Sequence, residues 1–408
     1  MDMYKTTIGF VFLASTAPAC AEEIKIKPII DARLRYESVD QVPLANDASA
    51  ITARVRAGIE AKTGAFAFLV EAEGTLAISE KYNSGLNGKG SFPVIADPQN
   101  IELNRAQVQF TAIPKTLVTL GRQRINLDDQ RFVGSVSFRQ NEQTFDAARV
   151  EYSGIKNVKA DVTYAWSNRT IWGIDGFGAR QQAVSGDNVF ANLSYKHKLG
   201  TLTGFAYLID QDEAAVSAFR LSSQSYGVRF SGAAQFSKSA KITYTASYAR
   251  QGDYHNNPNN YSADYLLAEL GGEAKGWKVM GGYEVLGAGS GASGGTALTS
   301  FQTPLATLHK FNGWTDRFLL TPANGLRDAY AVIGYTKPKI AGFDSIGVTA
   351  NYHDFRSDRL SQNYGDEWGA QLIAKRKKYT FTLKYADYNA KSFATDTKKF
   401  WASVDWAL

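Results

Sequence analysis

The sequence predicts an all-β protein: a transmembrane antiparallel β-barrel of about 18 strands, with a water-filled lumen and long extracellular loops. Apolar and polar residues alternate at period two in segment after segment, as in a wall with lipid on one side and water on the other. The connections between these segments alternate between short and long. No run of 18 apolar residues follows the N-terminal region, which excludes a helical membrane bundle.

Residues 1–21 are predicted to be a signal peptide. Lys5 precedes an apolar run from Ile8 to Ala14, and Ala19-Cys20-Ala21 forms a small-residue cleavage site. Cleavage near Ala21 leaves residues 22–408 as a single barrel domain in the bacterial outer membrane. Cys20 is the single cysteine of the chain, so the processed protein has no disulfide and no thiol chemistry. A lipoprotein anchor at Cys20 is the alternative, although the usual leucine three residues earlier is missing.

The period-two pattern is clearest in residues 51–62, where Ile51, Val55 and Ile59 alternate with Arg54 and Arg56. The remaining segments repeat it, and the total of 18 is even, as bacterial barrels require. The predicted strands are 29–38, 50–62, 64–79, 101–112, 115–125, 144–153, 156–167, 187–197, 200–211, 219–232, 239–251, 262–273, 276–286, 327–337, 345–355, 365–376, 378–388 and 398–408.

The connections test this count independently. Joins after even-numbered segments are short, and those after odd-numbered segments are mostly long, including 80–100, 126–143, 168–186, 252–261, 287–326 and 389–397. Since short turns of bacterial barrels face the periplasm, both chain ends are expected there. The last segment has an apolar, aromatic face from Phe400 to Leu408 and resembles the terminal signal that marks outer-membrane barrels for assembly.

Arginine is concentrated on the lumen-facing positions of the first six predicted strands. A guanidinium group is always charged and presents a planar fork that suits carboxylates, so this wall could guide an anion. The alternative is that the charges pair with one another and brace the wall; both interpretations remain open. The lumen-facing arginines are Arg33, Arg35, Arg54, Arg56, Arg105 and Arg149.

The stretch RQRINLDDQRF, residues 122–132, ends the fifth strand and enters a long loop. Its charged residues cannot all face lipid, so we expect them at the outer mouth of the lumen. Val118 and Leu120 share a parity with Arg122 and Arg124, so Gly121 is a candidate for a β-bulge that changes the register.

Two blocks, LGRQRINLDDQRFVGSVSFRQNEQTFDAARV (120–150) and FQTPLATLHKFNGWTDRFLLTPANGLRDAY (301–330), resemble the alginate-export family of outer-membrane barrels. The resemblance implies an 18-stranded barrel that carries an anionic polyuronate through an arginine-rich pore, with loops folding over or into the lumen. It implies that the selectivity region contains Arg122, Arg124, Asp128, Asp129, Arg131, Arg139, Asp146 and Arg149. It also offers Lys310, Trp314, Asp316 and Arg317 as a loop gate, with packing of the loop on itself as the alternative. The run GAGSGASGG, from Gly287 to Gly295, is interpreted as a flexible linker.

We therefore expect passive, anion-selective passage of an acidic polysaccharide or its oligomers. The alternatives are a general or oligosaccharide-uptake porin and, less favoured, an outer-membrane hydrolase. The four histidines lie in no catalytic or metal-binding motif, so we expect no enzyme, cofactor or metal site. Calcium at Asp253 and the following asparagines remains open, although a solvated turn is the simpler reading. The expected partners are outer-membrane lipid and an anionic polysaccharide, with periplasmic secretion proteins left open; no nucleic acid is expected, and a monomer is favoured.

Overall fold

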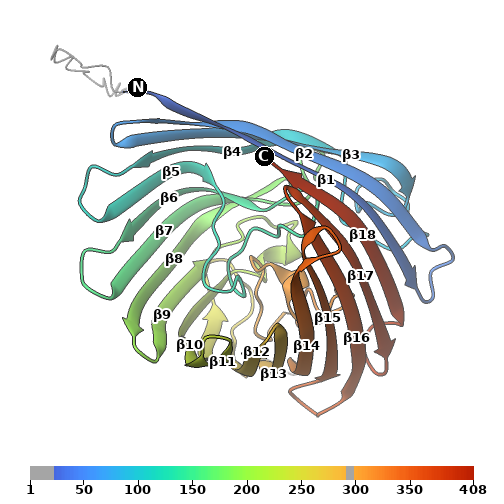
Figure 1. The fold of residues 1–408 in the computed structure, drawn as a ribbon. Helices are drawn as coiled ribbons and strands as arrows, with labels where there is room; N and C mark the ends of the chain where they lie inside the picture. The colour runs from blue at the N-terminus through green and yellow to red at the C-terminus, as the bar shows by residue number, and fades with distance from the viewer. Residues whose placement is uncertain (1–22, 291–297) are drawn as a thin grey trace, which may run out of the picture.

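A computed structural model describes residues 23–290 and 298–408, which form one closed antiparallel sheet of 18 strands (Figure 1). Each strand pairs with its neighbours in sequence, and β18 closes the ring on β1 with the register Asp31 to Ala407 through Gln41 to Thr397. Closure leaves no open edge in the sheet. The strands are β1 (Lys25–Gln41), β2 (Ala48–Thr63), β3 (Phe66–Lys81), β4 (Asn100–Phe110), β5 (Thr116–Gln123), β6 (Thr144–Tyr152), β7 (Val158–Arg169), β8 (Ala183–His197), β9 (Gly200–Ile209), β10 (Ser223–Ser237), β11 (Ala240–Asp253), β12 (Ser262–Ala274), β13 (Trp277–Leu286), β14 (Leu326–Ile340), β15 (Phe343–Arg356), β16 (Asn363–Arg376), β17 (Tyr379–Ala390) and β18 (Thr397–Ala407).

The outer face of the barrel is apolar. On β15, for example, Val348 and Tyr352 are about half exposed, whereas Asn351 and His353 between and beside them are buried in the interior. The same alternation recurs around the ring, so the predicted lipid-facing band is confirmed as an apolar outer surface. Its exposed members include Val55, Ile59, Leu193, Leu202, Val228, Leu270, Val279, Ile333, Val348 and Leu383.

The predicted count and alternation of connections are also confirmed. Two-residue turns join β10 to β11 and β12 to β13, whereas 287–325 and 124–143 are long. β10 begins at Ser223 because residues 217–219 form a short 3₁₀ turn. Among the described residues, no helix has the length and apolar character needed to cross a bilayer. The predicted signal peptide and most of the glycine-rich linker lie outside the described residues.

Two long connections, 124–143 and the described parts of 287–325, turn into the barrel (Figure 1). The ring of Phe132 packs at 5.1, 5.2 and 5.9 Å from those of Phe205, Tyr265 and Phe301. We call the buried set around these rings the dry cluster, and it joins both loops to the inner faces of β6–β9 and β11–β17. Part of the interior is therefore occupied, and one of the remaining cavities lies beside β1, β2, β18 and the start of β17. The dry cluster comprises Ile125, Leu127, Phe132, Val133, Phe145, Ala147, Ala165, Phe190, Phe205, Tyr207, Ile209, Ala249, Tyr261, Ala263, Tyr265, Leu267, Leu286, Phe301, Leu305, Phe318, Leu326, Phe355, Tyr364 and Tyr388.

Candidate functional site: an arginine cavity and an outer vestibule

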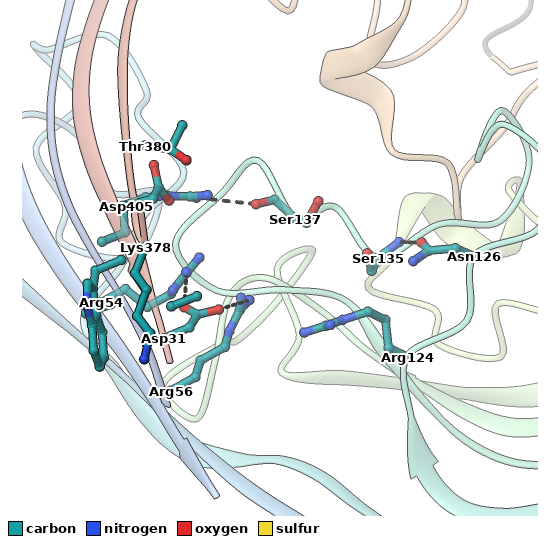
Figure 2. Close-up of a pocket in the computed structure, with 14 residues that line it drawn as sticks. Asp31, Arg54, Arg56, Arg124, Asn126, Ser135, Ser137, Lys378, Thr380 and Asp405 are labelled. Atoms are coloured by element: carbon teal, nitrogen blue, oxygen red, sulfur yellow. Dashed lines mark hydrogen bonds and ion pairs between the residues drawn. The ribbon is translucent and has the colours of Figure 1, made fainter. Parts of the chain in front are cut away.

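A cavity of about 350 Å³ lies between the barrel wall and the loop that follows β5 (Figure 2). We call it the arginine cavity. Five cationic side chains line it, against two carboxylates, so its electrostatic potential favours an anion. Those side chains are Arg33, Arg54, Arg56, Arg124 and Lys378 on the cationic side and Asp31 and Asp405 on the acidic side, with Thr380, Asn126, Ser135 and Ser137 among the remaining polar lining.

Arg54 differs from the other arginines of the cavity because part of its guanidinium has no partner. Its Nη2 donates to Asp31, but Nε and Nη1 have no hydrogen-bond acceptor among the described residues. The residue is only 3 % exposed. A buried donor without an acceptor costs about 1–3 kcal/mol, so an anion that supplied oxygen atoms here would relieve that cost.

The other arginines of the cavity are held by carboxylates. Arg33 Nε lies 2.5 Å from Asp405 Oδ1, and Arg56 pairs with Glu73 and, at 3.4 Å, with Glu142. Arg124 also pairs with Glu142. These pairs fix the positions of the guanidinium groups, so the predicted bracing and the predicted cationic lining coexist in the same residues.

Residues 135–139, the crossing segment, separate the arginine cavity from a second space. Ser135 and Ser137 line the arginine cavity, whereas Val136 and Arg139 line the second space. Arg33 Nη1 donates to the carbonyl oxygen of Phe138 at 3.0 Å, and Arg35 Nη1 donates to the same oxygen at 2.6 Å. The wall of β1 therefore holds the crossing segment in place.

The second space is a cavity of about 410 Å³ formed mainly by the long loops, which we call the outer vestibule. Much of its wall is apolar, with Trp172, Leu319 and Leu320 as large members. Several cations also line it, and Asp316 is the acidic residue among the lining side chains. This combination suits a solute that carries both an apolar group and an anionic group. The cations are Arg139, Arg180, Arg317 and Lys399.

A buried network centred on His309 ties the second loop to the wall. His309 Nδ1 is 2.7 Å from Asp316 Oδ1, and Nε2 is 2.7 Å from Lys384 Nζ. Burial and the nearby Lys384 charge lower the pKa of His309 to about 3, so the imidazole is neutral. Burial alone would raise the pKa of the Asp316 carboxyl, but the charge of Lys399 and the hydrogen bond with His309 hold that pKa well below its usual range. The stack of His309 on Phe138, at 3.5 Å between ring centroids, links this network to the crossing segment.

Arg131 anchors the first loop to the barrel interior. Its Nε lies 2.6 Å from Glu284 Oε1 on β13, and its Nη2 donates to Asn312 of the second loop at 3.0 Å. The residue is 2 % exposed. Desolvation opposes its charge, but Glu284 raises the pKa of Arg131 above its usual range. One buried guanidinium thus joins both loops and the wall.

The structure divides the predicted selectivity and gate residues into groups. Arg33, Arg54, Arg56 and Arg124 meet in the arginine cavity, and Arg139, Asp316 and Arg317 meet in the outer vestibule. The others lie elsewhere. Three arginines form ion pairs: Arg35 with Asp97 beneath the crossing segment, and on the wall Arg105 with Glu71 and Arg149 with Asp161. In the first loop, Asp128 accepts a hydrogen bond from Asn192, and Asp129 pairs with Arg229. In the second loop, Lys310 donates to the carbonyl oxygen of Asp129, and the ring of Trp314 lies under the ammonium group of Lys384.

The bulge considered at Gly121 is not found. Strand β5 pairs with β4 and β6 without a register shift, so Arg122 keeps the parity of the exposed Leu120. Asp146 Oδ1 lies 2.7 Å from Arg122 Nε, and Asp146 has the parity of the exposed Val150. The expectation that this pair lines the lumen is therefore corrected. Mutual neutralisation allows both charges to stay on the outward side of the wall.

Several site residues were not singled out from the sequence. Thr380 and Asp405 have lumen parity on the last two strands, and Lys378 directly precedes β17 with the same parity, so that signal was available in the alternation. Arg180 and Glu142 lie in long loops, where no periodicity indicates which way a side chain points.

One group of described residues has spacing that would allow a metal ion. Asp187, Asp210 and His255, at the long-loop rim, bring ligand atoms within 4.8 Å of one another. Nothing else around them points to a bound ion. Asp253, considered for calcium, accepts the backbone N–H of Tyr261 at 3.4 Å.

Comparison with solved structures places the fold. The chain is similar to OccAB4 of Acinetobacter baumannii, with a TM-score of 0.69 and 13 % identity over 96 % of this chain and 100 % of that one. It is also similar to OpdL of Pseudomonas aeruginosa (TM-score 0.63, 13 % identity, 94 % and 98 % covered) and to OpdK of the same organism (0.65, 10 %, 94 % and 98 %). One OpdK structure contains vanillate.

The fold is that of a bacterial outer-membrane β-barrel. The exposed apolar band agrees with a location in the outer membrane. The sequence matches no protein-family profile and no curated protein. Because these structural neighbours are Occ and Opd proteins rather than alginate exporters, the expected outer-membrane barrel fold is supported and the expected alginate-export family is not.

Proposed function

We propose that the protein is a porin-type channel for small organic anions, which pass between the outer vestibule and the arginine cavity around the crossing segment. The observation that carries this proposal is the pair of unpartnered nitrogens on buried Arg54, in a cavity with more cations than carboxylates. A carboxylate has two acceptor oxygens and matches a guanidinium edge. Weak, repeated contacts with such groups suit conduction, because tight binding would prevent release.

The volumes favour a small solute over a threaded polymer. Cavities of about 350 and 410 Å³ are at the lower end of the range for small-molecule sites, about 300–1,000 Å³. The dry cluster occupies interior space beside β6–β9 and β11–β17. A polyuronate chain would require the two loops to move, whereas a single sugar acid or aromatic acid would not. We therefore favour uptake or exchange of monomers and short oligomers over export of a polysaccharide.

The outer vestibule adds a preference for amphipathic anions. Trp172, Leu319 and Leu320 offer apolar contacts beside the charges of Arg180 and Arg317. Vanillate, present in one OpdK structure, combines an aromatic ring with a carboxylate, which is the chemistry this vestibule would accept.

Recordings from planar bilayers test the proposal. In a KCl gradient the reversal potential should show anion preference, and mannuronate or vanillate should block the current whereas glucose should not. Arg54→Gln should reduce both the anion preference and the block. The matched control is Arg250→Gln, because Arg250 is an exposed arginine that bonds to Ser262 on the neighbouring strand and lines neither cavity. Cation preference, or an Arg54→Gln channel indistinguishable from the unmodified one, would overturn the proposal.

A further inference from the structure

Lysine is distributed very unevenly between the two ends of the barrel. Of the 24 lysines among the described residues, 17 lie at the end with the short turns, on strand ends and in the turns themselves. In bacterial barrels this end faces the periplasm. We call them the lysine ring: Lys25, Lys27, Lys62, Lys115, Lys156, Lys159, Lys196, Lys198, Lys238, Lys241, Lys275, Lys278, Lys337, Lys339, Lys375, Lys377 and Lys378.

Many of these lysines face the pore rather than the lipid. Lys25 and Lys27 have the parity of Arg33 on β1, and Lys62 has the parity of Arg54 on β2. Lumen parity is shared by Lys159, Lys196, Lys241, Lys278 and Lys375. Lys378 lines the arginine cavity itself, so the lysine ring and the arginine cavity are continuous.

Most of the charge in the lysine ring is uncompensated. Lys62 pairs with Glu60 at 2.5 Å, Lys159 with Glu151 at 2.7 Å, and Lys241 with Glu273 at 3.0 Å. Within the described part of the chain, the ammonium groups of the other members have no carboxylate oxygen within 4 Å. The opposite mouth differs, since the β9–β10 loop alone carries Asp210, Asp212 and Glu213 against Arg220.

We propose that the lysine ring is an anion-collecting antechamber that makes the channel electrically asymmetric. A ring of like charge at a pore mouth raises the local concentration of counter-ions and can raise association rates by roughly 10- to 1,000-fold. Lysine ammonium groups are compact and strongly hydrated, so they hold anions more loosely than the arginine forks deeper in the pore. Anions would therefore enter the arginine cavity faster from the short-turn end than from the long-loop end. This inference rests on the proposed anion passage.

The test is a comparison of anion block from the two sides of single oriented channels. Ser239→Cys, in the β10–β11 turn, allows a membrane-impermeant thiol reagent to report which chamber faces the short turns, because the processed chain is expected to contain no other cysteine. At 0.1 M KCl the rate of block by mannuronate should be at least about threefold higher from the short-turn chamber. At 1 M KCl, where charges are screened beyond about 3 Å, the two rates should converge.

Removing lysine charges tests whether the lysine ring, and no other feature of the barrel, causes the difference in block rate between the two sides. The triple variant Lys25→Gln, Lys196→Gln and Lys278→Gln removes three unpaired lysines with lumen parity and should reduce the sidedness at 0.1 M KCl. The matched control, Lys81→Gln, Lys89→Gln and Lys391→Gln, removes as many charges from the long-loop end and should retain it. An anion-selective channel with equal block rates from both sides would overturn this inference and leave the proposed function standing. A cation-selective reversal potential would overturn both.

Discussion

Replacing Arg131 with methionine tests whether one buried ion pair holds the loops inside the barrel. Arg131 bonds to Glu284 at 2.6 Å, to Thr303 at 3.0 Å and to Asn312 at 3.0 Å. Removing one partner of a buried pair leaves the other charge uncompensated, at a cost of about 3–5 kcal/mol. This cost destabilises the docked loops relative to the undocked ones, because water can solvate Glu284 once the loops leave the barrel interior. The undocked population should rise by roughly a hundredfold to several thousandfold, at about 1.4 kcal/mol per factor of ten.

Two measurements check this expectation. Hydrogen exchange of residues 124–143 should speed up, and single-channel conductance should rise and become noisier. The double variant Arg131→Met and Glu284→Gln is the matched control. It removes the stranded charge but keeps an amide that can bond to Tyr265 and Asn312, the neighbours of Glu284. Native exchange and conductance in the single variant, or a double variant that behaves no better than the single one, would refute the reasoning.

Two further predictions concern pH and lipid contact. The pKa of His309, at about 3, is below its unfolded value of about 6.5, so between these values only the undocked loop takes up a proton. Docking of the loop should therefore be complete above pH 6.5 and weaken as the pH falls. His309→Gln should flatten the pH dependence of hydrogen exchange and of conductance, whereas His255→Gln should not. The same pH dependence in the unmodified protein and in both variants would contradict this reasoning. Val348→Arg, on the outward face of β15, should lower the unfolding free energy in lipid by about 2–4 kcal/mol, whereas Thr349→Arg, on the inward face, should cost much less. Equal losses in urea titrations would show that Val348 does not contact lipid.

The strands could be predicted because lipid and water impose opposite requirements on neighbouring residues. In residues 51–62 every second side chain had to be apolar, and that constraint is local in sequence. The error at β5 has a physical origin. The prediction placed Arg122 at the lumen mouth because the charged residues of 122–132 cannot all face lipid, but Asp146 on the adjacent strand neutralises Arg122 on the outward side.

The loops could not be predicted in the same way, because contacts with distant residues fix their conformation. The crossing segment is held by Arg33 and Arg35, about 100 positions earlier, and by His309, about 170 positions later. The unpartnered nitrogens of Arg54 likewise depend on which carboxylates neighbouring strands bring close. The two blocks that suggested an alginate exporter form the inward-turning loops. Phe132 and Phe301 show that burial inside the barrel constrains these blocks independently of any polymer.

The dry cluster has a consequence for molecular sieving. An empty ring of 18 strands would have a bore wide enough for bulky sugars, but aromatic packing against β6–β9 and β11–β17 occupies part of that bore. The cavities that remain have volumes of about 350 and 410 Å³. Size exclusion is thus decided by loop residues such as Phe132 and Phe301 rather than by the strand count. Homologous barrels with identical walls could admit solutes of very different girth through exchange of these two loops alone.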